Sequence, residues 1–214
     1  LRFNWNTPIH VSPNVKGKIY IGSQFLFAST DHGQSWQRIS PDLTTNDPVK
    51  QRQEESGGIT VDNSAAEMHT TIYAISESPR TADVIWVGTD DGNVQVTRDG
   101  GKSWTNTDRN VKRLPPASWV STVEAGHFAD GVAYVTFDRH TYGDMNPWAY
   151  RTEDFGRTWQ RIAGPGQGVR GYAHVIKEDP VNANVLYLGT EFGLWISIDR
   201  GATWAEFKGG NFPA

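Results

Sequence analysis

The stretch Thr97-Arg98-Asp99-Gly100-Gly101-Lys102-Ser103-Trp104 decides the fold of this chain. Its pattern, Ser/Thr-x-Asp-x-Gly-x-Ser/Thr-Trp, returns at three other places. A pattern that recurs in this way marks a repeat protein, and this is the first property to interpret. In chain order the four copies, which we call boxes 1 to 4, are Ser29–Trp36, Thr97–Trp104, Thr152–Trp159 and Ser197–Trp204.

Each box has the chemistry of a tight turn. The Asp carboxylate can accept backbone N–H groups at the turn entry, and the Gly two residues later supplies a positive φ. The Ser/Thr hydroxyls can hold both flanks, and the Trp offers a large apolar surface to bury. Catalytic groups are rarely repeated identically in every unit, so we interpret these residues as structural. They are Asp31, Gly33, Trp36, Asp99, Gly101, Trp104, Asp154, Gly156, Trp159, Asp199, Gly201 and Trp204.

Short segments with strand character flank the boxes, and each repeat contains four of them. The third strand of a repeat enters its box and the fourth leaves it, so each box is the turn of a hairpin. The second strand carries an aromatic residue followed by an aliphatic one, and alternate side chains of a strand point to opposite faces. We therefore expect the two faces of each repeat to pack on the two neighbouring repeats.

Four-stranded antiparallel units of this length are typical of β-propeller blades. A single blade cannot bury both of its faces, so blades must stack on one another. We predict an all-β chain of four such blades, forming an arc of a larger propeller in a single region, residues 1–214. The expected blades cover about residues 1–40, 69–108, 119–163 and 171–208, and a long connection covers residues 41–68.

The boxes resemble the Asp-box, or bacterial neuraminidase repeat (BNR), of sialidases, two-propeller xyloglucanases and sortilin receptors. Three further stretches make the chain similar to bacterial secreted BNR-repeat glycosyl hydrolases and sortilin-like proteins: Ser40–Pro48, Glu54–Gly58 and Val84–Asn93. The resemblance implies a propeller from a secreted or periplasmic parent protein. Its partners would be the remaining blades of that propeller or a second copy of the chain, because exposed apolar blade faces would aggregate.

Composition excludes several classes of function. The 24 acids and 20 bases leave a net charge of -4, which argues against nucleic-acid binding. Cysteine is absent, so disulfides and thiolate metal sites cannot form. No apolar run approaches the ~18 residues of a membrane-spanning helix, and no signal peptide is visible. The histidines His10, His127 and His174 lack metal-ligand spacing, so we expect no metal, and we expect no cofactor.

The order of the strands separates two faces of a propeller. The boxes lie on one face, here the box face. The loops between second and third strands, and the connections between blades, lie on the opposite face, here the loop face. The two long stretches, residues 41–68 and 138–147, both belong to the loop face. Long loops on a rigid scaffold are where function usually resides, so we place the candidate site there.

Three acids follow second strands on the loop face: Asp90, Asp138 and Glu191. Glycoside hydrolysis needs two carboxylates across a sugar, one protonated and one ionised, so these acids are the candidate catalytic residues. The structural alternative is that they cap loop turns, because the position recurs from blade to blade.

Other candidates are binding residues. The loop that contains Arg139, His140, Tyr142 and Trp148 mixes cations with aromatic rings that could stack on a sugar or anchor a peptide. Alternatively, this is a solvated loop and Trp148 packs into a strand. Glu55 lies within the long connection and His69 directly follows it. This connection could be a lid over the ring centre or an ordered crossing between blades.

Two functions remain open from the sequence. The first is a module of a larger secreted sortilin-like protein that binds a glycan or peptide on the loop face. The second is part of a xyloglucanase- or sialidase-like glycoside hydrolase, inactive alone because two-propeller enzymes draw their acids from both propellers. Sialidases also need an arginine cluster and a Tyr nucleophile, and no motif marks Arg113, Arg139 or Arg170 for that role.

Overall fold

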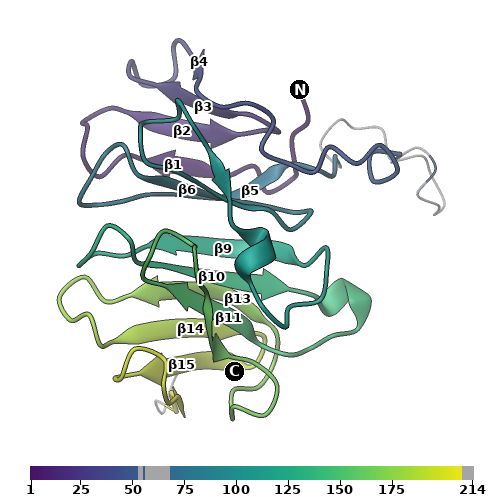
Figure 1. The fold of residues 1–214 in the computed structure, drawn as a ribbon, viewed down its shortest axis with the longest axis vertical. Helices are drawn as coiled ribbons and strands as arrows, with labels where there is room; N and C mark the ends of the chain where they lie inside the picture. Colours follow the sequence, from purple (N-terminus) through teal and green to yellow (C-terminus); the bar gives the residue numbers. More distant parts are fainter. Residues whose placement is uncertain (53–54, 56–67, 209–214) are drawn as a thin grey trace.

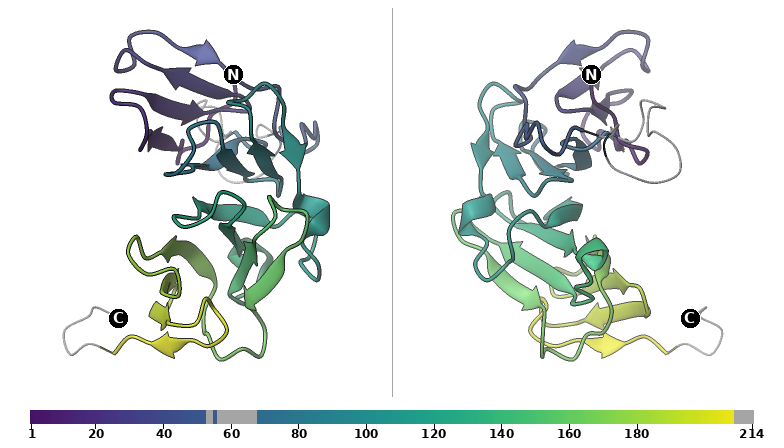
Figure 2. Two further views of the ribbon diagram at one scale, coloured as in Figure 1. Left: turned by 60° about the vertical axis from the view of Figure 1, so that its left-hand side comes forward. Right: turned by 90° about the vertical axis from the view of Figure 1, so that its right-hand side faces the viewer.

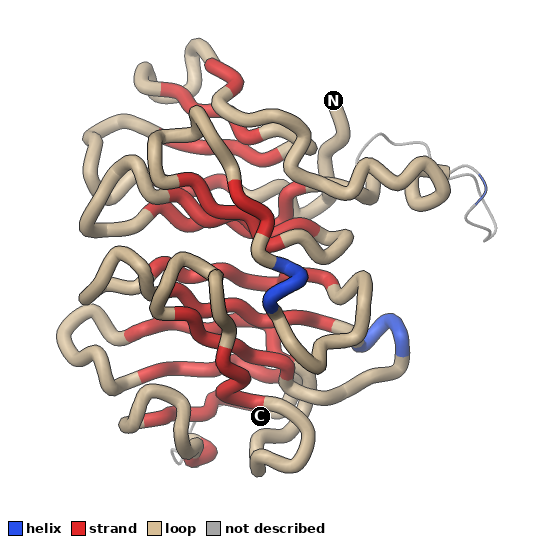
Figure 3. Tube along the Cα trace, in the orientation of Figure 1, coloured by secondary structure: helices blue, strands red, loops and turns tan. Residues whose placement is uncertain are grey.

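The computed structural model of the chain describes residues 1–52, 55 and 68–208. These residues form sixteen short β-strands in four antiparallel four-stranded sheets, and no α-helix is found among them. Short helical turns are the only helical structure between the strands of the described chain (Figure 3). The prediction of an all-β chain of four-stranded antiparallel units is therefore confirmed.

The sheets follow one another in the sequence, and we call them blades 1 to 4. Blade 1 contains β1 (Ile9–Val11), β2 (Ile19–Gly22), β3 (Leu26–Ser29) and β4 (Gln37–Arg38). Blade 2 contains β5 (Ile72–Glu77), β6 (Ile85–Thr89), β7 (Val94–Thr97) and β8 (Thr105–Asn106). Blade 3 contains β9 (Trp119–Ala125), β10 (Ala133–Asp138), β11 (Trp148–Thr152) and β12 (Gln160–Ala163). Blade 4 contains β13 (Ala173–Glu178), β14 (Leu186–Thr190), β15 (Gly193–Ser197) and β16 (Ala205–Glu206).

The blades stack face to face in chain order (Figure 1) and follow an arc with blades 1 and 4 at its two ends (Figure 2). Within each blade every strand pairs with the next along the chain. Each blade range expected from the sequence encloses one of these sheets. The grouping of all 214 residues into one propeller region stays a prediction.

The hydrophobic core lies between the blades. Tyr20 and Leu26 of blade 1 pack with Ile72 and Val87 of blade 2 in one cluster. Similar clusters join blade 2 to blade 3 and blade 3 to blade 4. We call the side of a blade that faces the preceding blade its leading face, and the side that faces the following blade its trailing face. Alternate residues of each strand supply the two faces, as the period of two requires.

The four boxes share one set of hydrogen bonds. In box 2 the Ser103 N–H and hydroxyl donate to Asp99 Oδ1 and Oδ2 at 2.9 and 2.6 Å. The Thr97 hydroxyl donates to Asp99 Oδ1 and accepts the Gly101 N–H. The equivalent bonds occur in boxes 1, 3 and 4. Because the Ser103 hydroxyl, the Ser103 N–H and the Thr97 hydroxyl favour the ionised form, the pKa of Asp99 is lowered to about 2.

Each box contains two successive residues in the left-handed region. The box glycines have φ between 78 and 100°. The residue before each of them is also left-handed: His32 at 59°, Gly100 at 70°, Phe155 at 58° and Arg200 at 60°. The sequence pattern predicted a left-handed backbone only at the glycine. The position just before the glycine gave no signal, because it carries a different residue in each box.

The box Trp side chains join neighbouring blades. The indole N–H of Trp104 donates to the Ile39 carbonyl of blade 1, and that of Trp204 donates to the Ile162 carbonyl of blade 3. Trp159 packs edge-to-face on Trp86 of blade 2. Trp36 is 41% exposed, since no blade precedes it in the described chain, whereas Trp159 is 7% exposed and Trp104 and Trp204 are half-buried.

A Tyr–Glu contact also crosses two of the blade boundaries. The Tyr134 hydroxyl of blade 3 donates to Glu178 Oε1 of blade 4 at 2.8 Å. At the boundary of blades 1 and 2, burial and then the charge of Glu77 raise the pKa of Tyr20. Between blades 2 and 3 the aromatic residue is Trp86, and Ala125 occupies the register position that Glu holds in blades 2 and 4. The boundaries are therefore similar but not interchangeable.

Candidate functional site

The three acids singled out in the sequence lie at equivalent places on the loop face. Asp90 follows β6, Asp138 ends β10 and Glu191 follows β14. These strands hold the second position in their blades and run in the same sense, so their carboxyl ends meet on one side of the arc. The surroundings of the three carboxylates nevertheless differ.

Asp90 is a buried structural anchor. It is 2% exposed and accepts the Thr71 N–H and hydroxyl at 2.8 and 2.6 Å. His69 Nδ1 lies 3.7 Å from its Oδ1. Burial raises the pKa of Asp90, against the opposing effects of His69 and the bonds from Thr71. The carboxylate therefore ties the start of β5 to the end of β6, which fits the loop-capping alternative.

Asp138 holds two imidazole rings. Its Oδ1 accepts the His140 N–H at 2.9 Å and lies 2.6 Å from His140 Nδ1. Its Oδ2 lies 3.7 Å from His174 Nδ1. The His140 ring stacks on Tyr172 with centroids 4.6 Å apart, and Tyr172 meets His174 edge to face. Residues from blades 3 and 4 thus form one aromatic cluster around a carboxylate that is 7% exposed.

A pocket of about 470 Å³ opens beside this cluster. It is lined by Asn6, Tyr73, Trp119, Ser121, Asp138, His140, Thr141 and His174. The Tyr73 and Trp119 rings meet edge to face with centroids 4.8 Å apart, and the Asn6 amide donates to the Tyr73 hydroxyl. The lining of the pocket therefore combines an aromatic pair with the Asp138–His140 couple. We call this site the loop-face pocket.

The other candidates of the same loop lie elsewhere. Arg139 donates to the Pro116 carbonyl and the Ser118 hydroxyl and pairs with Asp144, so its guanidinium braces the loop. Tyr142 is 59% exposed in a 3-10 turn, under the Arg139 guanidinium. Trp148 is 6% exposed and its indole N–H donates to Asp144, so of the two alternatives the structure favours a Trp148 packed into its strand over a sugar-stacking residue.

Glu191, Glu55 and His69 do not line the loop-face pocket either. Glu191 is exposed beyond Tyr172, and its charge adds to burial in raising the pKa of Tyr172. Glu55 is exposed and pairs with Arg52, while Glu54 and most of residues 51–68 lie outside the described residues. The described start of the connection crosses blade 2, where Leu43 is buried and Thr45 bonds Asp91.

The sequence did not single out the aromatic wall of the pocket. Tyr73, Trp119 and Tyr172 lie at or just before the starts of first strands, and each first strand begins at the loop face. The recurrence of an aromatic residue near the start of the first strand in three blades is the sequence pattern that could have pointed to them. Across the described residues no group of three or more His, Asp or Glu side chains gathers to hold a metal ion.

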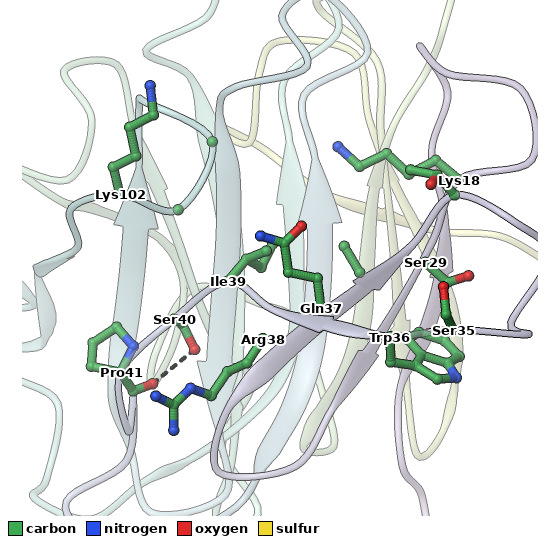
Figure 4. A pocket seen from close by; sticks show the side chains of 14 residues that line it. Lys18, Ser29, Ser35, Trp36, Gln37, Arg38, Ile39, Ser40, Pro41 and Lys102 are labelled. Atoms are coloured by element: carbon green, nitrogen blue, oxygen red, sulfur yellow. Dashed lines mark hydrogen bonds between the residues drawn. The ribbon is translucent and has the colours of Figure 1, made fainter.

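A second pocket, of about 820 Å³, lies on the box face between boxes 1 and 2. Figure 4 shows Trp36 and Ser35 at one end of β4 and Lys102 on the neighbouring box. At the later boundaries this space is occupied, because Arg98 covers the Phe155 ring at 4.1 Å and Glu153 pairs with Arg200 at 3.7 Å. At the first boundary the corresponding residues are Thr30 and Gly100, which are smaller, and the pocket between boxes 1 and 2 stays open.

Known proteins support the fold and the repeat. Residues 27–38 match the BNR/Asp-box repeat family. A vacuolar protein sorting/targeting protein 10 of Aspergillus flavus is 32% identical over 65 residues, which is 30% of this chain and 4% of that protein. The same protein of Aspergillus oryzae matches equally well. The chain thus spans only 4% of the length of the curated relatives it matches.

Two solved structures share the fold over 98% of this chain. An ancestral GH74 enzyme superposes with a TM-score of 0.69 at 16% identity, over 25% of its own chain. The GH74 xyloglucanase from Xanthomonas campestris superposes with a TM-score of 0.66 at 15% identity, over 31% of its chain. The chain therefore carries a recognised Asp-box repeat, and its four sheets have the arrangement of an arc of propeller blades. In the described part of the chain no helix is long and apolar enough to cross a membrane.

Proposed function

We propose that this chain is a carbohydrate-binding module of a larger, secreted Asp-box propeller protein. The observation that carries the proposal is the loop-face pocket, which is lined by both the Tyr73–Trp119 pair and the Asp138–His140 couple. Aromatic faces bury the C–H side of a sugar ring, and a few polar groups fix its hydroxyls. A pocket of about 470 Å³ is large enough for a short saccharide.

The polar groups of the pocket suit hydroxyl recognition. Asp138 engages His140 Nδ1, which leaves His140 Nε2 as the ring nitrogen that a ligand hydroxyl can reach. Asn6 and Ser121 add an amide and a hydroxyl, each of which can donate and accept. The similarity in fold to a xyloglucanase supports a plant-type glucan as the first ligand to test.

The direct test is calorimetric titration of the chain with xyloglucan oligosaccharides and, separately, with cello-oligosaccharides. Trp119→Ala removes the aromatic wall and is expected to weaken binding at least about 10-fold, the effect of losing roughly 1.5 kcal/mol. Phe192→Ala is the matched control, because Phe192 is a 54% exposed aromatic residue on the same face but outside the pocket. Equal affinity of wild type and Trp119→Ala for every sugar tested would reject the proposal.

A peptide is the other ligand class for the same pocket, and the relatedness to a vacuolar sorting protein favours it. Peptides from a random library, titrated in place of the sugars, separate the two ligands. Binding of a peptide that Trp119→Ala abolishes, without binding of any sugar, would replace the carbohydrate proposal by this one.

A glycoside hydrolase is the second candidate function, favoured by the similarity in fold to GH74 enzymes and by Asp138, a carboxylate that lines the loop-face pocket. Asp138→Asn distinguishes it from binding. A hydrolase loses turnover of a chromogenic glucan by orders of magnitude, whereas a binding module shows no turnover in either form and changes only in affinity.

A further inference from the structure

The pocket between boxes 1 and 2 on the box face is lined by positive charge. Its volume is about 820 Å³, and we call it the box-face pocket. The basic side chains of Lys18, Arg38 and Lys102 line it, and among the residues that the structure describes no Asp or Glu does. In Figure 4, Lys102 and Lys18 lie on either side of Gln37, so basic groups border the pocket on two sides.

Lys18 stands where the other blades carry valine. The residue just before the second strand is Val84, Val132 or Val185 in blades 2 to 4, and it is Lys18 in blade 1. Val84 and Val132 pack with the clusters that join their blades to the following blade. In blade 1 the Lys18 ammonium lies 5.0 Å from the centre of the Tyr20 ring. The first boundary therefore has a cation at a place where the next two boundaries have an apolar contact.

The acid that neutralises a cation at another boundary is replaced at this one. Between blades 3 and 4, Glu153 of box 3 pairs with Arg200 of box 4 at 3.7 Å. The residue of box 1 that corresponds to Glu153 is Thr30, which lines the box-face pocket. Within the described chain neither Lys18 nor Lys102 forms an ion pair. Their charges are therefore available to a ligand.

Neutral polar groups lie beside these cations. The Gln37 amide and the Thr30 hydroxyl line the pocket, and neither forms a hydrogen bond within the described chain. The carboxylates of Asp31, Asp83 and Asp99 also belong to the box face, but none of the three lines the pocket. The pocket therefore offers positive charge together with neutral groups that can donate and accept hydrogen bonds.

We propose that the box-face pocket binds an acidic saccharide, in which ring hydroxyls accompany a uronate carboxylate or a sulfate ester. Lys18 and Lys102 bind the anionic group, because hydrogen bonds between ionised partners are stronger than neutral ones. The Gln37 amide and the Thr30 hydroxyl bind ring hydroxyls. A volume of about 820 Å³ admits a short oligosaccharide, whereas a simple inorganic anion would fill only a small part of it. This site lies on the opposite face from the loop-face pocket and is independent of it.

The first test is calorimetric titration of the chain with oligogalacturonate and, separately, with a sulfated heparin-type oligosaccharide, at about 0.05 M salt to limit screening. We expect binding, and the saccharide that binds more tightly identifies the anionic group as carboxylate or sulfate. Lys18→Ala combined with Lys102→Ala is expected to weaken binding at least about 10-fold. Lys16→Ala is the matched control, because Lys16 is an exposed lysine in the same turn as Lys18 and does not line the pocket.

A second variant gives box 1 the acid that box 3 carries. Thr30→Glu places a carboxylate in the pocket, where it competes with the ligand for the lysines, and is expected to weaken binding about 10-fold or more. Ile198→Glu is the control, because Ile198 is the corresponding residue of box 4, is 74% exposed and lies outside the pocket. Circular dichroism unchanged from wild type shows that these variants fold.

Four results would overturn the proposal. The first is a wild type that binds neither acidic saccharide. The second is a loss of affinity in Lys16→Ala as large as that in the double variant, which would show attraction by overall charge. The third is equally tight binding of oligoglutamate, which would show that the saccharide is not recognised. The fourth is loss of the acidic saccharide in Trp119→Ala, which would place it in the loop-face pocket.

Discussion

The box face and the loop face are built on the same strands but obey different rules. On the box face, four turns repeat one set of hydrogen bonds around Asp31, Asp99, Asp154 and Asp199. On the loop face, Gln24, Asp90, Asp138 and Glu191 occupy equivalent strand ends and have four different surroundings. The repeat therefore governs what holds each blade together and leaves the opposite face free to differ from blade to blade.

The strongest test of this difference removes a box Trp. Trp159→Ala opens a cavity where the indole, 7% exposed, packs on Trp86 between blades 2 and 3. We expect the free energy of unfolding to fall by about 4 kcal/mol, measured by urea denaturation. Trp36→Ala is the matched control and should cost less than about 1 kcal/mol in the monomer, because Trp36 is 41% exposed. Equal losses would mean that the boxes act within blades and not between them.

A pair of glycines compares the two faces directly. Gly156 on the box face and Gly143 on the loop face have φ of 78° and 73°. Alanine costs about 1 kcal/mol for the left-handed backbone at either place. At Gly156 the new Cβ would also lie 2.5 Å from Thr107, whereas at Gly143 nothing lies within 4 Å. We expect Gly156→Ala to cost about 3 kcal/mol and Gly143→Ala about 1 kcal/mol, again by urea denaturation.

Lowering the pH is expected to destabilise the protein through the Asp residues of the box face. Hydrogen bonds from the Ser35, Ser103 or Thr203 hydroxyl, and then from the same residue's N–H, lower the pKa of Asp31, Asp99 and Asp199 to about 2. A carboxyl whose pKa is lowered by folding stabilises the protein above its unfolded pKa of about 4. That contribution is lost as the pH falls towards about 2. We expect the melting temperature to drop across this window, and the drop to shrink when the three Asp residues are replaced by Asn.

The smallest effect on stability is expected on the loop face. Asp138→Asn keeps the shape of the side chain, and its partners His140 and His174 are 42% and 51% exposed, so water can replace the lost interaction. The free energy of unfolding should change by less than about 1 kcal/mol, while sugar affinity falls. A loss of several kcal/mol without a change in affinity would assign Asp138 to the scaffold.

The fold could be predicted from the sequence because its chemistry is local. Each box forms its hydrogen bonds within eight residues, from Thr97 to Trp104 in box 2. The spacing of these residue types in the sequence is therefore enough to predict the turn. The four residue types that define a box also located the hairpin turns, and the strands could then be assigned to the segments on either side of each turn. What the pattern could not show is which box has a blade in front of it, and Trp36 is exposed for that reason.

The candidate site was predictable only in part, because its members come from distant positions. The sequence pointed to Asp138 and His140, which are two residues apart, but not to Tyr73, Trp119 or His174. These side chains reach the loop-face pocket from the starts of three different first strands. For Trp148 the sequence left two alternatives open, because a Trp that opens a strand can face either solvent or the core, and the structure favours the core.

The Tyr–Glu contact between blades has a consequence for the order of the units. Glu178 of blade 4 suits the Tyr134 hydroxyl, whereas Ala125 of blade 3 occupies the same register position opposite Trp86. Exchanging blades 3 and 4 would set the Glu178 carboxylate against the Trp86 ring and leave Tyr134 without an acceptor. The repeats are therefore not interchangeable, and a chain with its blades permuted would need compensating substitutions first at these two positions.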